Sequence, residues 1–250
     1  MAGVGALGAL VVLAAPLVAH ADTLVKGRLK GVEALLNPVA TEAADPNNHR
    51  FTFREPSATV SQQAKILTAF LPKELCVVAL GPESKGQGTA RVVVSGGRTT
   101  PVTIVVNEGQ TLQFENHDPF VHRLYDVGGK GGFAVAETAP KAARSWTPPP
   151  GAATYELRDE RAPSLRTWVV VEPKATRAVT PNAAHACGVV TRRGEFTLSL
   201  PEGKFDLRGY FKGAPVGEAL PVEVKAGKDK QDLPDPLVVG KAESDTKKGG

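Results

Sequence analysis

Short apolar runs, many of them alternating with polar residues, follow one another along the chain, and long helical periodicities are scarce. Runs of this kind, separated by Gly, Pro and Asn, predict β-strands. We expect strands over residues 23–31, 49–55, 74–80, 90–96, 101–106, 110–118, 143–148, 153–159 and 166–172. A short helix is expected only over residues 57–70. Strands at this spacing without intervening helices favour antiparallel sandwiches, so the predicted fold class is all-β.

A second small β-unit follows Pro173. Arg193 and Gly194 predict a hairpin turn, and residues 201–203 predict another turn. Apolar positions alternate on either side of that second turn at Phe196, Leu198, Leu200, Phe205 and Leu207. Residues 229–250 carry alternating charges and end in Lys-Lys-Gly-Gly, so we expect a flexible C-terminal tail.

Composition agrees with a turn-rich β-protein, because the 250 residues include 26 Gly and 20 Pro. The formal net charge of +4 is spread along the chain without a long run of one sign. That distribution argues against a nucleic-acid partner.

The N-terminal residues 1–21 are an apolar run of small residues that ends in Ala19-His20-Ala21. A small-x-small ending of this type is typical of a signal-peptide cleavage site, although no basic residue precedes Lys26. The alternative is a membrane anchor, but the run contains Pro16 and is shorter than the roughly 20 apolar residues that a span requires. We therefore expect export, a periplasmic or secreted location, and no stable membrane span after cleavage.

Export would place Cys76 and Cys187 in an oxidising compartment, where they can form one intramolecular disulfide. The alternative is a metal site, because His185 and Cys187 are two positions apart and would share a strand face. With Cys76, they could supply thiolate and imidazole ligands.

Residues 105–127 read VVNEGQTLQFENHDPFVHRLYDV, and residues 155–171 read YELRDERAPSLRTWVVV. The first segment places Gly109 before a strand and then Phe114, Asn116, Asp118 and His122 in order. Over residues 91–171 the chain resembles the cupredoxins, and within them the plastocyanin-like, methylamine-utilisation-type domains. The resemblance implies a Greek-key β-sandwich in which His122 occupies the place of the first copper ligand.

The other three ligands of that family, Cys, His and Met, lie in one loop before the last strand. They suit a type 1 copper site because thiolate and imidazole bind copper strongly and a thioether binds it weakly. Matching Pro163, Arg166 and the final valines without a gap places the three family positions at Asp159, Ala162 and Leu165. The resemblance therefore implies a cupredoxin fold with a degenerate, vacated copper site. Four consecutive charges at residues 158–161 also predict a solvated loop.

Two roles for His122 stay open. It can be a structural loop histidine, with Asp159 accepting a hydrogen bond from a ring nitrogen. Alternatively, His117, His122 and Asp159 can form a remodelled site for zinc or copper, since imidazole and carboxylate bind such ions.

Residues 190–211 resemble a second family, the transthyretin-like or carboxypeptidase regulatory-like β-sandwich, through Gly194, Phe196, Leu198 and the following turn. Strands similar to those expected early in that fold occur upstream of the cupredoxin-like segment. The resemblance thus implies two β-sandwiches, with the cupredoxin-like domain inserted into the regulatory-like (Ig/transthyretin-like) one. The expected divisions are a signal peptide at 1–21, a discontinuous sandwich at 22–88 plus 173–228, a cupredoxin-like domain at 89–172 and a tail at 229–250. A Cys76–Cys187 disulfide would then lie within one domain and stabilise it by ~4 kcal/mol.

No nucleophile motif, phosphate loop or zinc-protease motif occurs in the chain. Asp159 and Glu160 are adjacent, but neighbours on a strand face opposite ways, which argues against paired acid–base chemistry. Trp146 and Trp168 could form a sugar-stacking surface or belong to the core.

These observations favour a non-catalytic exported protein that has no cofactor and binds another envelope or extracellular protein. The competing hypothesis is a periplasmic copper- or zinc-binding or electron-transfer protein that uses His122.

Overall fold

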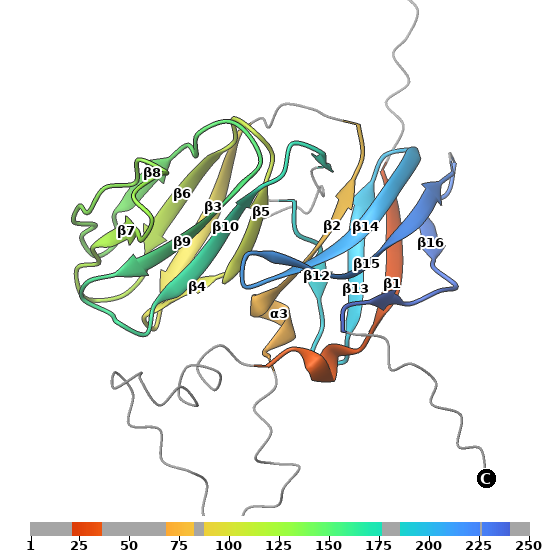
Figure 1. Cartoon of the computed structure of the whole chain (residues 1–250), viewed down its shortest axis with the longest axis horizontal. Helices are drawn as coiled ribbons and strands as arrows, with labels where there is room; N and C mark the ends of the chain where they lie inside the picture. The colour runs from red at the N-terminus through yellow and green to blue at the C-terminus, as the bar shows by residue number, and fades with distance from the viewer. Residues whose placement is uncertain (1–21, 37–68, 83–87, 177–185, 226, 241–250) are drawn as a thin grey trace, which may run out of the picture.

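The computed structural model describes residues 22–36, 69–82, 88–176, 186–225 and 227–240, and the regular secondary structure in this part of the chain is almost entirely β. The predicted all-β class is therefore confirmed. Strands β3 to β10, from the middle of the sequence, form one unit, which we call the central unit. β1, β2 and β11 to β17 form a second unit beside it, which we call the outer unit (Figure 1).

The central unit consists of two four-stranded sheets, ordered β4-β3-β6-β8 and β5-β10-β9-β7. Its strands are β3 (Thr89–Ser95), β4 (Arg98–Thr100), β5 (Thr103–Val106), β6 (Thr111–Asn116), β7 (Leu124–Asp126), β8 (Ala143–Trp146), β9 (Ala153–Asp159) and β10 (Arg166–Val171). β3 pairs in parallel with β6, and β5 pairs in parallel with β10. One hydrophobic cluster takes side chains from both sheets, including Val92, Phe114, Leu157 and Val169.

The outer unit has a five-stranded and a four-stranded sheet, ordered β12-β13-β1-β16 (with β17 also on β1) and β11-β2-β14-β15. Its strands are β1 (Thr23–Lys30), β2 (Leu75–Leu80), β11 (Ala175–Thr176), β12 (Val189–Val190), β13 (Glu195–Leu200), β14 (Gly203–Phe211), β15 (Ala214–Val224), β16 (Lys230–Asp232) and β17 (Leu237–Val238). The short helices η1 (Val32–Ala34) and α3 (Leu71–Glu74) lie at one end of this unit.

The alternating apolar residues of β13 and β14 are all buried in the outer unit's own cluster, as their period of two predicts. The turn at Arg193 and Gly194 joins β12 to β13 in an antiparallel pair. The turn at residues 201–203 instead carries the chain from one sheet to the other, since β13 pairs with β1 and β14 pairs with β2. Two strands adjacent in sequence therefore supply their apolar faces from different sheets to one core.

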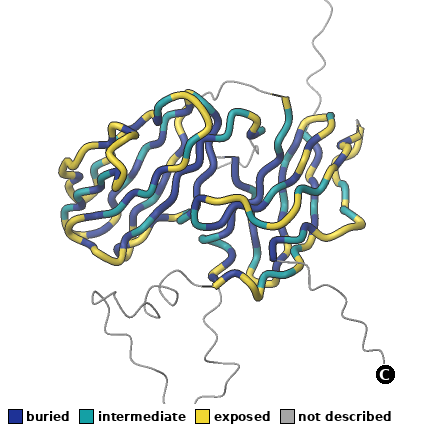
Figure 2. Tube along the Cα trace, viewed as in Figure 1, coloured by how far each residue is buried: buried dark blue, intermediate teal, exposed yellow. Residues whose placement is uncertain are grey.

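The two units meet along strands that are buried on both faces, namely β2, β5 and β10 (Figure 2). The short segment Ala186–Gly188 lies between them: the Ala186 N–H donates to the Val105 carbonyl at 3.0 Å, and the Gly188 N–H donates to the Val77 carbonyl at 2.8 Å. Cys187 and Cys76 form the expected disulfide in this contact, with 4% and 1% of their surfaces exposed. Residues 104–106 of β5 and 168–171 of β10 are uninterrupted apolar runs, as expected for strands that are covered on both faces.

The expectation of a flexible tail is wrong for residues 229–240. β16 pairs in parallel with Leu24–Lys26 of β1, and β17 pairs in parallel with Leu29 and Lys30. Leu237 and Val239 are buried in the outer core. The sequence pattern did not predict these two strands, because charged residues surround them. Strands this short also do not show the alternation of apolar and polar residues.

The expected strand at 49–55 and most of the expected helix at 57–70 lie outside the described residues; the described Ala69 and Phe70 are not helical. No helix within the described ranges is long and apolar enough to cross a membrane.

Candidate functional site

His122 is completely buried between β6 and β7, at one end of the central unit. Its backbone forms an isolated antiparallel bridge with Thr138, with N–H to carbonyl distances of 3.1 and 2.8 Å. The ring of Phe120 packs on the imidazole with 4.8 Å between the ring centroids. These contacts fix the ring so that its two nitrogens face different loops.

Nε2 of His122 lies 3.0 Å from Oδ2 of Asp118, four residues earlier. The same carboxylate accepts the backbone N–H groups of Gly96 at 2.6 Å and Gly97 at 2.9 Å. Both glycines have a positive φ, which the tight turn from β3 to β4 requires. Burial acts to raise the pKa of Asp118, but the hydrogen bonds from Gly97, Gly96 and His122 outweigh it and hold the pKa below its ordinary value.

Nδ1 of His122 lies 3.0 Å from Oδ2 of Asp159, at the end of β9. This oxygen also accepts the backbone N–H of Arg123 at 2.8 Å. The other oxygen of Asp159 accepts the N–H groups of Arg161 and Ala162 at 2.6 and 2.8 Å. The hydrogen bond expected between His122 and Asp159 is therefore present.

The expectation of a solvated loop is wrong for Asp159, because its side chain is fully buried. A buried carboxylate is tolerated when hydrogen bonds satisfy its oxygens, and Asp159 has four donors. Its neighbour Glu160 is exposed and pairs with Arg123 at 2.9 Å.

The arrangement has a clear consequence for the chemistry of His122. The remaining donors to Asp118 and Asp159 are backbone N–H groups. A carboxylate oxygen lies 3.0 Å from each ring nitrogen of His122, so neither nitrogen faces an open position for a ligand. The two carboxylates also approach opposite nitrogens, so they do not converge with the ring on one point in space.

His117 belongs to a different contact. Its ring is half exposed, and Nε2 lies 3.4 Å from Oε2 of Glu115. Arg91 binds the two oxygens of Glu115 with both distances at 2.6 Å. That hydrogen bond lowers the pKa of Glu115, against the opposing effect of burial. The structure thus does not bring His117 together with His122 and Asp159.

Across the part of the chain that the structure describes, no group of three or more His, Cys, Asp and Glu side chains is placed to hold a metal ion. The alternative thiolate site is wrong for the two cysteines, because both sulfurs are used in the disulfide. His185 lies outside the described residues.

The other two positions that the sequence comparison matched to copper ligands, Ala162 and Leu165, are apolar. Ala162 and Leu165 are buried in the central core, and the Leu165 N–H donates to the Ala162 carbonyl at 2.8 Å.

Trp146 and Trp168 are 7% and 9% exposed, which favours core packing over an exposed sugar-stacking surface. Trp146 donates its ring N–H to the Gly131 carbonyl at 2.8 Å.

Sequence reasoning missed the role of Asp118, although this residue is part of the family pattern and stands four positions before His122. It also missed Asn116, whose side chain donates to the carbonyls of Phe120 and Thr138 and accepts the N–H of Asp118. The spacing of Asn116, Asp118 and His122 was the available signal.

Comparison with known proteins finds solved amicyanin structures that are similar to part of the chain. No protein family matches the chain, and no curated protein does. Among solved structures, a mutant of amicyanin in the Cu(I) state is 22% identical and covers 40% of this chain and 100% of its own, with a TM-score of 0.31. An oxidized amicyanin mutant is 23% identical, with the same coverage and TM-score.

Proposed function

We propose that this protein is an exported, non-catalytic binding protein in which a cupredoxin-like domain has lost its copper site and serves as a scaffold. The observation that carries the proposal is the occupation of both His122 ring nitrogens by the carboxylates of Asp118 and Asp159. A copper ligand needs a free imidazole lone pair, and this network uses both ring nitrogens. Hydrogen bonds connect the three segments that would surround a metal, namely the β3–β4 turn, the β6–β7 loop and the end of β9.

The finer architecture that we propose is two β-sandwiches, with the cupredoxin-like one inserted into a regulatory-like one. Two observations support it: each unit has its own hydrophobic cluster, and β2 precedes the central unit while its partners β11 and β14 follow it. Insertion is favoured where the ends of the inserted domain lie close together. The sequence signal for the regulatory-like family is the alternating stretch at 190–211.

Export is proposed from the N-terminal apolar run and from the disulfide, since disulfides persist in oxidising compartments such as the periplasm. A protein in that location has other envelope or extracellular proteins as its natural partners. Binding, rather than catalysis, is proposed because the side chains of His122, Asp118 and Asp159 are engaged with one another.

The test is a titration of the exported chain, residues 22–250, with copper(II) and zinc(II). We expect no stoichiometric uptake that depends on His122. The comparison variants are His122→Ala and, as a matched control, His117→Ala, which removes an exposed imidazole. One equivalent of metal bound by the intact chain and by His117→Ala, but lost in His122→Ala, would overturn the proposal in favour of metal handling.

A further inference from the structure

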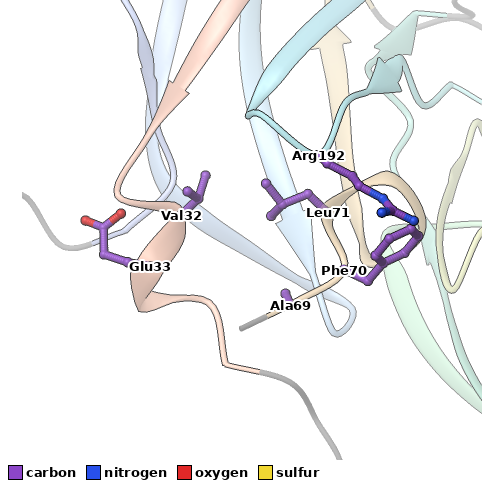
Figure 3. Close-up of a pocket in the computed structure, with 6 residues that line it drawn as sticks. All are labelled: Val32, Glu33, Ala69, Phe70, Leu71 and Arg192. Carbon is purple, nitrogen blue, oxygen red and sulfur yellow. The ribbon is translucent and has the colours of Figure 1, made fainter. Parts of the chain in front are cut away.

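A cavity of about 550 Å³ lies in the outer unit, far from His122 in the sequence. It is formed by η1, by the residues at the start of α3 and by the turn after β12, and Figure 3 labels the side chains around it. These are Val32, Glu33, Ala69, Phe70, Leu71 and Arg192. The volume is in the range of small-molecule sites, roughly 300–1,000 Å³.

Four of the six side chains that line this cavity are apolar, and Glu33 and Arg192 are charged. Ala69 and Leu71 are buried and belong to the outer core, so they form a fixed floor. Val32 packs against the same core and is only partly covered. Phe70 lies between Ala69 and Leu71 in sequence but is 37% exposed, which leaves one edge of the ring available to a ligand. The backbone N–H of Phe70 donates to Glu74, so this polar group is already satisfied.

Arg192 is the cation of the cavity. Its guanidinium lies over the Phe70 ring, 4.9 Å from the centroid. Among the described residues it forms no ion pair, whereas Arg91, Arg123 and Arg158 are all bonded to glutamates. In Figure 3 the carboxylate of Glu33 is on the opposite side and points away from Arg192. One end of the cavity is therefore positive and its middle is apolar.

We infer that this cavity is a binding site for an apolar ligand that bears one carboxylate, with the carboxylate on Arg192 and the apolar body against Phe70, Leu71 and Val32. A guanidinium presents a planar fork that matches the two oxygens of a carboxylate. Stacking on Phe70 holds that fork in place and adds a cation–π contribution. The inference goes beyond the proposed function, because the ligand is a small molecule and not a partner protein.

The experiment is a calorimetric titration of residues 22–250 with decanoate, below its aggregation concentration, and with decanol as the uncharged match. We expect saturable binding of decanoate with one site per chain and at least about tenfold weaker binding of decanol, because a charge-assisted pair is lost. Arg192→Gln should bring decanoate down to the affinity of decanol. Arg193→Gln removes the neighbouring exposed cation, which does not line the cavity, and should change the affinity less than about twofold.

Phe70→Ala removes an apolar contact from both ligands and also the ring that holds Arg192, so it should weaken decanol and should weaken decanoate by at least the same factor. No saturable binding of decanoate, equal binding of decanol, or equal losses in Arg192→Gln and Arg193→Gln would each overturn this inference. None of these outcomes changes the metal titration, so the vacated copper site and the carboxylate site fail or survive separately.

Discussion

Two nitrogen-bearing side chains in this molecule each pack on an aromatic ring at similar distances, yet their surroundings differ completely. His122 lies 4.8 Å from Phe120 and is enclosed by two carboxylates. Arg192 lies 4.9 Å from Phe70 and has no anionic partner among the described residues. The first region is closed because carboxylates of the same chain occupy both nitrogens of the His122 ring. The second region leaves the guanidinium of Arg192 available to a ligand. We therefore expect a ligand to bind at Arg192, which has no anionic partner among the described residues, and not at His122.

Removing the carboxylate of Asp159, which has the most hydrogen-bond partners, should destabilise the network around His122. Asp159→Ala leaves the N–H groups of Arg123, Arg161 and Ala162 and one side of His122 unsatisfied in the interior. We expect a loss of about 4 kcal/mol in the free energy of unfolding, measured by urea denaturation. Glu160→Ala is the matched control, because that exposed carboxylate should contribute less than about 1 kcal/mol. Equal effects of the two substitutions would show that the network is not structural.

The disulfide lies between the two regions, where the central and outer units meet. Changing Cys76 and Cys187 together to Ser should lower the free energy of unfolding by about 4 kcal/mol, since the crosslink spans 111 residues. Because both sulfurs are in the disulfide, thiol alkylation should be negligible even in denaturant, unless a reductant is added. Rapid labelling of two thiols in protein purified under oxidising conditions would contradict the pairing.

Asp118→Asn sharpens the comparison with a smaller change of shape. It keeps one oxygen as an acceptor for the glycine turn but weakens the contact with His122, so we expect a loss of about 2 kcal/mol at neutral pH. The pKa of Asp118 is lowered in the folded protein, so its stabilising contribution is present above its unfolded pKa and is lost as the pH falls through the folded one. The difference in stability between the two proteins should therefore shrink towards acid pH. A constant difference across that range would contradict the assignment.

Phe70→Ala should have the smallest effect on stability, because the ring is partly exposed and its main described contact is Arg192. We expect a change below about 1 kcal/mol in the free energy of unfolding. A loss as large as that of Asp159→Ala would mean that the ring is part of the core, and the contrast between the two regions would disappear.

Much of the fold could be predicted from local pattern. The alternation of Phe196, Leu198 and Leu200 is a property of neighbouring residues, and it gave the buried face of β13 correctly. The pairing of Cys76 with Cys187 followed from their number. The candidate site was predicted in part: His122 and Asp159 are together, whereas Asp118 was given no role and His117 pairs elsewhere.

By itself, the sequence determined most of the longer strands, which of their side chains are buried, and that Asp159, Ala162 and Leu165 supply no Cys, His or Met. Only the tertiary structure decided that Asp159 is buried within a run of four charges, because its donors come from loops distant in sequence and from its own turn. It also decided that Lys230–Asp232 and Leu237–Val238 are strands, since their backbone partners are on β1, some two hundred residues earlier. Local pattern carries the preference of each residue for burial, whereas the satisfaction of polar groups depends on which distant segments arrive beside them.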